Sequence, residues 1–215
     1  MSARFDELML AAEAAFTRDD LEGAAELYAQ AVDAARSEGN EDGADHAFCN
    51  HCSMLAELDR GAEQIPKLKE ILLRSSNDKN RFLAAYCTAV AYDLKDDRER
   101  SLSYANRAME LSDSLGEADL ISRSANLAGT LAIRDSKFDE ADRCYKKALS
   151  IQESLDGYHL IVRAQYKDNL GYVMMCTDRL EEGIELCETC LLYTSDAADD
   201  RRGVVMAGGG GGVVG

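Results

Sequence analysis

The chain has 215 residues, of which 46% are hydrophobic and 30% are charged, with one Pro and no Trp. This balance is typical of a protein that buries a core, and it excludes collagen-like and largely disordered chains. Asp and Glu number 40 against 24 Lys and Arg, so the formal net charge of -16 disfavours nucleic acid and anionic membrane surfaces as partners.

The N-terminus and the cysteines both indicate a chain that is not secreted. No apolar run reaches the ~18 residues of a membrane span, and the acidic, amphipathic N-terminus has no basic lead or cleavage site. We therefore expect a cytoplasmic chain. The seven cysteines are odd in number and irregularly spaced, which predicts reduced, mostly buried thiols rather than a disulfide framework.

Five segments of the chain are similar to one another, and each is predicted to be the second helix of a pair. In chain order they are DDLEGAAELYAQAVDAA (19–35), GAEQIPKLKEILL (61–73), DDRERSLSYANRAMEL (96–111), DSKFDEADRCYKKALSI (135–151) and DRLEEGIELC (178–187). Their apolar residues recur at helical rather than strand spacing. The second segment is the weakest match, and its Pro66 is tolerated where a helix begins.

One position in each of these helices has a counterpart twelve residues upstream, in the first helix of the same pair. The facing positions are Ala12 with Ala24, Cys52 with Gln64, Ala89 with Ser101, Gly129 with Ala141, and Gly171 with Gly183. Those of the first helices are 40, 37, 40 and 42 residues apart, a period near forty. Antiparallel helices approach closely where facing residues are small. The pattern predicts an all-α, right-handed α-solenoid of about five antiparallel helix pairs.

Turns rich in Gly, Asn, Asp and Ser divide this array from residue 1 to 189. We expect repeats at approximately 5–37, 44–75, 79–114, 117–154 and 158–189, the last of them truncated. Residues 190–215 show no helical period. They resemble a translated sequencing adapter followed by poly-Gly, and the alternative is a natural, disordered Gly-rich tail. Either interpretation removes them from the fold, and the first implies that the protein is a fragment that continues beyond the array.

The segments DDLEGAAELYAQAV, SKFDEADRCYKKALSI and NLGYVMMCTDRLEEG resemble the tetratricopeptide repeat family in their small, aromatic and alanine positions. The chain departs from the family in lacking a helix-ending Pro and in its degenerate second repeat. Its period exceeds the usual ~34 residues, as in the forty-residue subgroup that includes kinesin-light-chain-like and Leu-Gly-Asn-type adaptors. The resemblance implies a non-enzymatic scaffold or adaptor that binds a protein or peptide segment on the concave face formed by the first helices.

That resemblance also implies which residues line the groove. The candidates are Glu13, Phe16, Cys49, Tyr86, Asp93, Arg123, Asn126, Thr130, Arg134, Asp168, Asn169 and Tyr172. Asn can donate to and accept from a peptide backbone, and Tyr adds flat apolar area with a polar end. The alternative is that these are simply solvated positions. Arg123 and Arg134 form the one basic spot, whereas Met9 and Glu13 speak against a clamp for a C-terminal carboxylate in the first repeat.

Metal and catalytic chemistry has less support than packing. His46, Cys49, His51 and Cys52 are close in sequence, but one helix face joins only pairs of them, and no second pair completes a tetrahedral zinc site. The sequence contains no nucleophile elbow, phosphate loop or metalloprotease motif. We therefore predict no enzyme activity, no cofactor and no metal.

Two alternatives stay open. The array is the accessory or sensor arm of a larger enzyme or transcription regulator, whose catalytic or DNA-binding domain lies outside this sequence. Otherwise, Cys49 and Cys52 make it a metal- or redox-responsive helical protein. Because the last repeat has no polar cap, we also expect self-association through Leu180, Ile184 and their neighbours.

Overall fold

The computed structural model describes residues 3–155 and 160–188, and all of its regular elements in these ranges are helices. They are α1 (Ala3–Phe16), α2 (Leu21–Ser37), α3 (Glu41–Glu57), the short 3-10 helix η1 (Ala62–Gln64), α4 (Ile65–Arg74), α5 (Asp78–Leu94), α6 (Arg98–Leu115), α7 (Ala118–Arg134), α8 (Phe138–Ser154) and α9 (Leu160–Cys176). Residues 180–188 are also helical. The expected tail, 190–215, lies outside the described residues.

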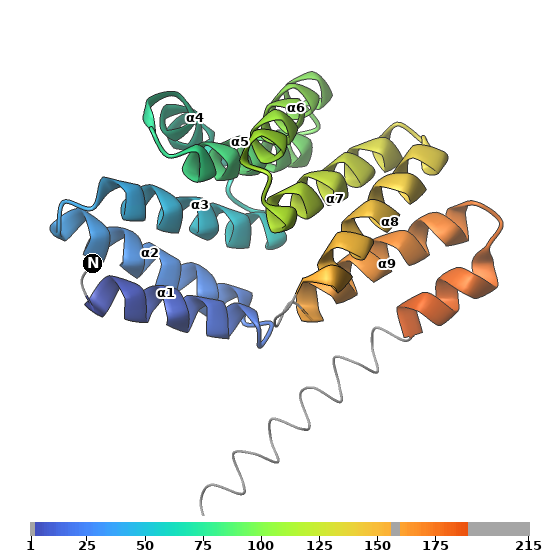
Figure 1. Cartoon of the computed structure of the whole chain (residues 1–215), viewed down its shortest axis with the longest axis horizontal. Coiled ribbons are helices and arrows are strands. Elements are labelled where there is room, and N and C mark those ends of the chain that lie inside the picture. The colour runs from blue at the N-terminus through green and yellow to red at the C-terminus, as the bar shows by residue number, and fades with distance from the viewer. Residues whose placement is uncertain (1–2, 156–159, 189–215) are drawn as a thin grey trace, which may run out of the picture.

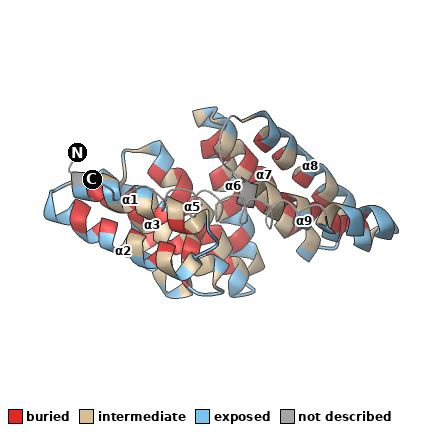
Figure 2. Ribbon diagram, turned by 90° about the horizontal axis from the view of Figure 1, so that it is seen from below, coloured by how far each residue is buried: buried red, intermediate tan, exposed pale blue. Residues whose placement is uncertain are grey.

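Helices that follow one another in the sequence pack together, except that α3 and α4 both pack mainly on α5, and the array follows an arc from α1 to α9 (Figure 1). The buried residues lie on the helix sides that meet neighbouring helices, and the exposed ones lie on the outside (Figure 2). Alanine dominates the core, because it lets helix axes come close. This architecture confirms the predicted all-α solenoid of helix pairs.

The same turn joins the first helix to the second helix in every pair. A residue shortly after the first helix has a left-handed backbone conformation, at Asp19, Asp59, Asp96, Ser136 and Asp178. The next backbone N–H donates to the carbonyl oxygen five residues earlier, over 2.7 to 3.0 Å, which is a Schellman-type helix end. These residues have the same 40, 37, 40 and 42 spacing as the facing positions, so the turn repeats with the helices.

A glycine at one of these left-handed positions will stabilise the fold. Ser136 has φ of 57° and an exposed side chain, so Ser136→Gly relieves backbone strain without losing a contact. We expect the free energy of unfolding to rise by about 0.5–1 kcal/mol in urea denaturation. As a control, Ser103→Gly, at an exposed position inside α6, will lower it by about 0.5 kcal/mol. Destabilisation by both substitutions would contradict this explanation of the turn.

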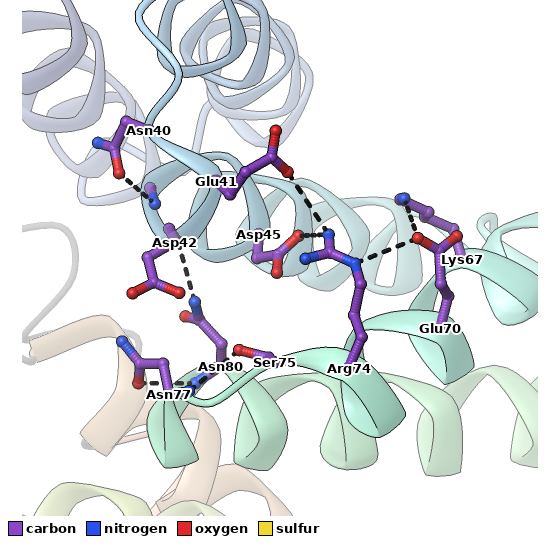
Figure 3. Close-up of polar contacts among 11 residues, drawn as sticks. Asn40, Glu41, Asp42, Asp45, Lys67, Glu70, Arg74, Ser75, Asn77 and Asn80 are labelled. Atoms are coloured by element: carbon purple, nitrogen blue, oxygen red, sulfur yellow. Dashed lines mark hydrogen bonds and ion pairs between the residues drawn. The ribbon is translucent and has the colours of Figure 1, made fainter.

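Polar contacts join the two helices of the degenerate second pair, α3 and α4, to each other and to α5 (Figure 3). The α4 helix has ten residues and packs mainly on α5. At its end, Arg74 Nη2 lies 2.6 Å from Asp45 Oδ1 on α3, and Arg74 Nε donates to Glu70 Oε1 over 3.2 Å. From α5, Asn80 Nδ2 donates to the Asp42 carbonyl oxygen over 2.9 Å. Directed polar contacts therefore hold α3, α4 and α5 together where the repeat pattern is weakest.

Candidate peptide-binding groove

A groove of about 660 Å³ follows the first helices of the pairs. Its lining comes from α1, α3, α5, α7, α9 and their termini, with Tyr28 of α2 the one contribution from a second helix in the described ranges. Each first helix presents residues three or four apart, as one helix face requires. On α3 these are His46, Asn50, Ser53 and Glu57. The groove is therefore a product of the repeat itself.

Nine of the twelve predicted groove residues meet at two adjoining hollows. The main groove includes Glu13, Phe16, Tyr86, Arg123 and Asn126. A second hollow of about 280 Å³ shares Tyr86 and Asn126 and adds Asp93, Thr130, Asp168 and Asn169. The structure brings these side chains onto one surface, and their role in binding a peptide stays a prediction.

Cys49 was predicted to line the groove, and this placement is wrong. Its side chain is fully buried, and Cys87 Sγ donates to the Cys49 carbonyl oxygen over 3.4 Å. Cys49 occupies the repeat position of Tyr86 and Asn126, whose longer side chains reach the groove, whereas a cysteine side chain ends inside the core. The neighbouring residues His46, Asn50 and Ser53 line the groove in its place.

The remaining two candidates, Arg134 and Tyr172, lie outside the lining of both hollows. Arg134 Nη2 forms an ion pair with Asp93 Oδ2 over 3.1 Å, which joins α7 to α5. Tyr172 is half exposed on α9. Leu180 and Ile184 are also exposed. Self-association through these residues stays a prediction, and sedimentation at high concentration tests it.

Two asparagine amides in the smaller hollow are hydrogen-bonded to each other. Asn169 Nδ2 donates to Asn126 Oδ1 over 3.1 Å. This bond leaves the Asn126 amide nitrogen as a donor and the Asn169 amide oxygen as an acceptor. Thr130 Oγ1 lies 3.1 Å from the Tyr145 hydroxyl, and this contact fixes the α7 side of the hollow. A backbone amide unit offers the complementary pair of groups.

Arg123, on α7, lines the main groove beside Tyr86 of α5. Its guanidinium carbon is 5.0 Å from the centre of the Tyr86 ring, which is cation–π distance. Burial raises the pKa of Tyr86 to about 12, so the phenol is neutral at physiological pH. Burial also lowers the pKa of His46, which lines the groove from α3 and stays neutral. Arg123 therefore contributes a positive charge among neutral rings.

Several lining residues were not predicted, and most are apolar or aromatic. They include Leu10, Tyr28, Met54, Leu83, Val90, Leu120, Val162 and Tyr166. The three-to-four spacing on each first helix could have identified those on α3, α5 and α7. Tyr28 could not have been found this way, because it reaches the groove from α2.

The cysteines at the core are poorly suited to reactivity. Burial raises the pKa of the Cys49, Cys52 and Cys87 thiols, so they stay protonated, and the thiolate is the reactive form. Among the described residues, no group of three His, Cys, Asp or Glu side chains could hold a metal ion. None of the described helices is long and apolar enough to cross a membrane.

No protein-family model matches the sequence, and no curated protein is similar to it. Solved structures do match. BtubC (BKLC) from P. vanneervenii aligns with a TM-score of 0.55 at 17% identity, over 98% of this chain and 84% of its own. The apo form of RapI aligns with a TM-score of 0.58 at 16% identity, over 91% and 72%.

A third match is a variant of a Podospora anserina kinesin-light-chain protein with nearly identical TPR-like repeats. Its TM-score is 0.53 at 11% identity, over 93% of this chain and 99% of its own. Identities this low concern the fold alone. Together with the helix pairs and the repeated turn, they show that this chain has the tetratricopeptide-like helical-repeat fold.

Proposed function

We propose that the chain is a non-enzymatic scaffold that binds an extended or helical segment of a partner protein in the main groove. The groove itself carries this proposal, because its lining draws on all five first helices. Enclosed small-molecule sites converge a few polar groups on one point. Here the polar groups are spread from α1 to α9, among aliphatic and aromatic side chains, as a long ligand requires.

The composition of the groove supports the same conclusion. Leu83, Leu120 and Val162 offer apolar contacts from α5, α7 and α9. Tyr and Arg are the residues that most often dominate the energy of protein interfaces, and Tyr86 and Arg123 lie side by side here. The amides of Asn126 and Asn169 suit a peptide backbone. The fold of BtubC, RapI and the kinesin-light-chain protein is consistent with a scaffold.

Filling the groove tests this proposal. Random peptides displayed on phage are selected on the wild-type protein, and the enriched sequences are then measured as synthetic peptides. Ala56 on α3 lines both hollows with a small side chain. Ala56→Trp places an indole there, and we expect it to weaken binding at least about tenfold in calorimetry.

A matched control introduces the same indole elsewhere. Ser103 is exposed on α6 and lies outside the lining of both hollows, so Ser103→Trp should leave the affinity unchanged. Far-ultraviolet circular dichroism confirms that both variants are folded. Failure to select any peptide, or equal binding to both variants, would overturn the proposed function.

A further inference from the structure

The Arg123 guanidinium has no carboxylate partner among residues 3–155 and 160–188, in a chain with 40 acidic and 24 basic residues. Other cations near the groove are neutralised within the chain. Lys79 Nζ lies 2.9 Å from Glu117 Oε1, and Arg134 Nη2 lies 3.1 Å from Asp93 Oδ2. Arg123 therefore differs from its neighbours in keeping its charge unmatched.

Asp119 and Glu57 interact electrostatically with Arg123 but form no ion pair with it. Asp119, one helical turn before Arg123, accepts a hydrogen bond from Gln152 Nε2 over 2.8 Å. Glu57, on α3, lies close enough to interact electrostatically with Arg123 but forms no ion pair with it. The nearby negative charges therefore stabilise the charged guanidinium, but no described carboxylate accepts a hydrogen bond from its N–H groups.

The aromatic contact holds Arg123 at the groove lining. Its guanidinium carbon lies over the Tyr86 ring, 5.0 Å from the ring centre. The N–H donors of a guanidinium lie in its plane, and their fork geometry suits a carboxylate with two parallel hydrogen bonds. Arg123 is thus positioned by Tyr86 with hydrogen-bonding capacity left for a ligand.

We propose that Arg123 binds the side-chain carboxylate of an Asp or Glu in the bound segment, next to aliphatic residues that contact Leu83 and Leu120. This inference rests on the proposed function and specifies its ligand. A phosphate dianion fits less well, because Lys79 and Arg134 are already paired and no second cation in the described groove meets its charge. The groove also continues on both sides of α7, towards α1 and towards α9, so the segment passes Arg123 rather than ending there.

The selected peptides give the first measurement. On the wild-type protein, we expect Asp or Glu to be enriched at one fixed position, with aliphatic residues beside it. A synthetic peptide with an amidated C-terminus, in which that acid becomes Asn or Gln, should bind about tenfold more weakly. A carboxylate that acts only as a free C-terminus would show the opposite pattern, with loss on amidation, and would overturn the assignment to a side chain.

A double-substitution cycle gives the second measurement. Arg123→Gln should lower the affinity for the acidic peptide about tenfold. It should leave the affinity for the amide-substituted peptide unchanged. Arg123→Lys should recover part of the loss, because it restores the charge but not the planar fork. Arg107→Gln on α6 makes the same charge change outside the groove lining and should leave binding unchanged.

The outcomes separate the two proposals. Peptides that Ala56→Trp blocks but that bind Arg123→Gln normally would refute the acidic anchor and leave the proposed function standing. Peptides that Ala56→Trp does not block would refute the proposed function itself. Additive losses in the cycle would also refute the anchor. If Arg123→Gln does not fold, the acid-to-amide change in the peptide still tests the anchor on the wild-type protein.

Discussion

Replacing Arg74 with alanine will lower the free energy of unfolding by about 2–3 kcal/mol at pH 7. Asp45, its partner on α3, is only 3% exposed, and its Oδ2 atom is buried without a hydrogen-bond partner in the described part of the chain. The substitution leaves this carboxylate uncompensated. Loss of a fully buried partner costs about 3–5 kcal/mol, and Arg74 is partly exposed, so we expect the lower value.

The effect should depend on pH with a definite sign. Burial raises the pKa of Asp45 although Arg74 opposes that shift, and removal of Arg74 raises it further. Below the unfolded-state pKa of about 3.9, Asp45 is protonated in both states and costs little. The unfolded state is common to both proteins, so the cost of Arg74→Ala grows as the pH rises from the folded-state pKa of Asp45 in the wild type to its higher folded-state pKa in the variant.

Urea denaturation of the single and double variants measures both features. Asp45→Asn in the Arg74→Ala background removes the buried charge and should restore most of the lost stability at pH 7. It should also remove the added pH dependence. A cost for Arg74→Ala that is the same at about pH 4 and pH 7, and that Asp45→Asn does not relieve, would contradict the account of this pair.

Gly129→Ala should also destabilise the protein, by about 1–2 kcal/mol. In an isolated helix, alanine is more favourable than glycine by about 1 kcal/mol. The expected destabilisation therefore comes from packing alone. An added Cβ would lie 2.7 Å from Tyr145 Cε1. The Tyr145 ring is 1% exposed and its hydroxyl contacts Thr130, so it has little room to move.

A second background isolates this contact. In Tyr145→Leu the side chain that meets the new methyl group is smaller, so Gly129→Ala should cost less there than in the wild-type protein. Thermal or urea unfolding of the four proteins gives the coupling between the two sites. Equal costs in both backgrounds would show that the close approach of α7 and α8 does not depend on Gly129.

The helix pairs could be predicted from sequence because the repeat is local and periodic. The facing positions from Ala12 to Gly171 have the same spacing as the left-handed turn residues from Asp19 to Asp178. At the last pair, a Cβ on Gly183 would lie 2.6 Å from the Gly171 carbonyl oxygen, so that position does require a small residue.

Other features do not follow from the repeat spacing. The Asp45–Arg74 pair joins residues that belong to the repeat with the weakest match, and no spacing rule indicates it. The length of the Cys49 side chain, not its repeat position, keeps it out of the groove. Whether Arg123 has a partner depends on α3, α5 and α9 together, so its unmatched charge becomes evident only in three dimensions.

Hydrogen–deuterium exchange on the wild-type protein, with and without a peptide selected on it, tests the central claim most directly. If the segment lies in the groove, slowed exchange should map to α1, α3, α5, α7 and α9, and should be greatest near Tyr86 and Arg123. Helices α2, α4, α6 and α8 should be little changed. Slowed exchange confined to these second helices would contradict a peptide-binding groove on the first helices.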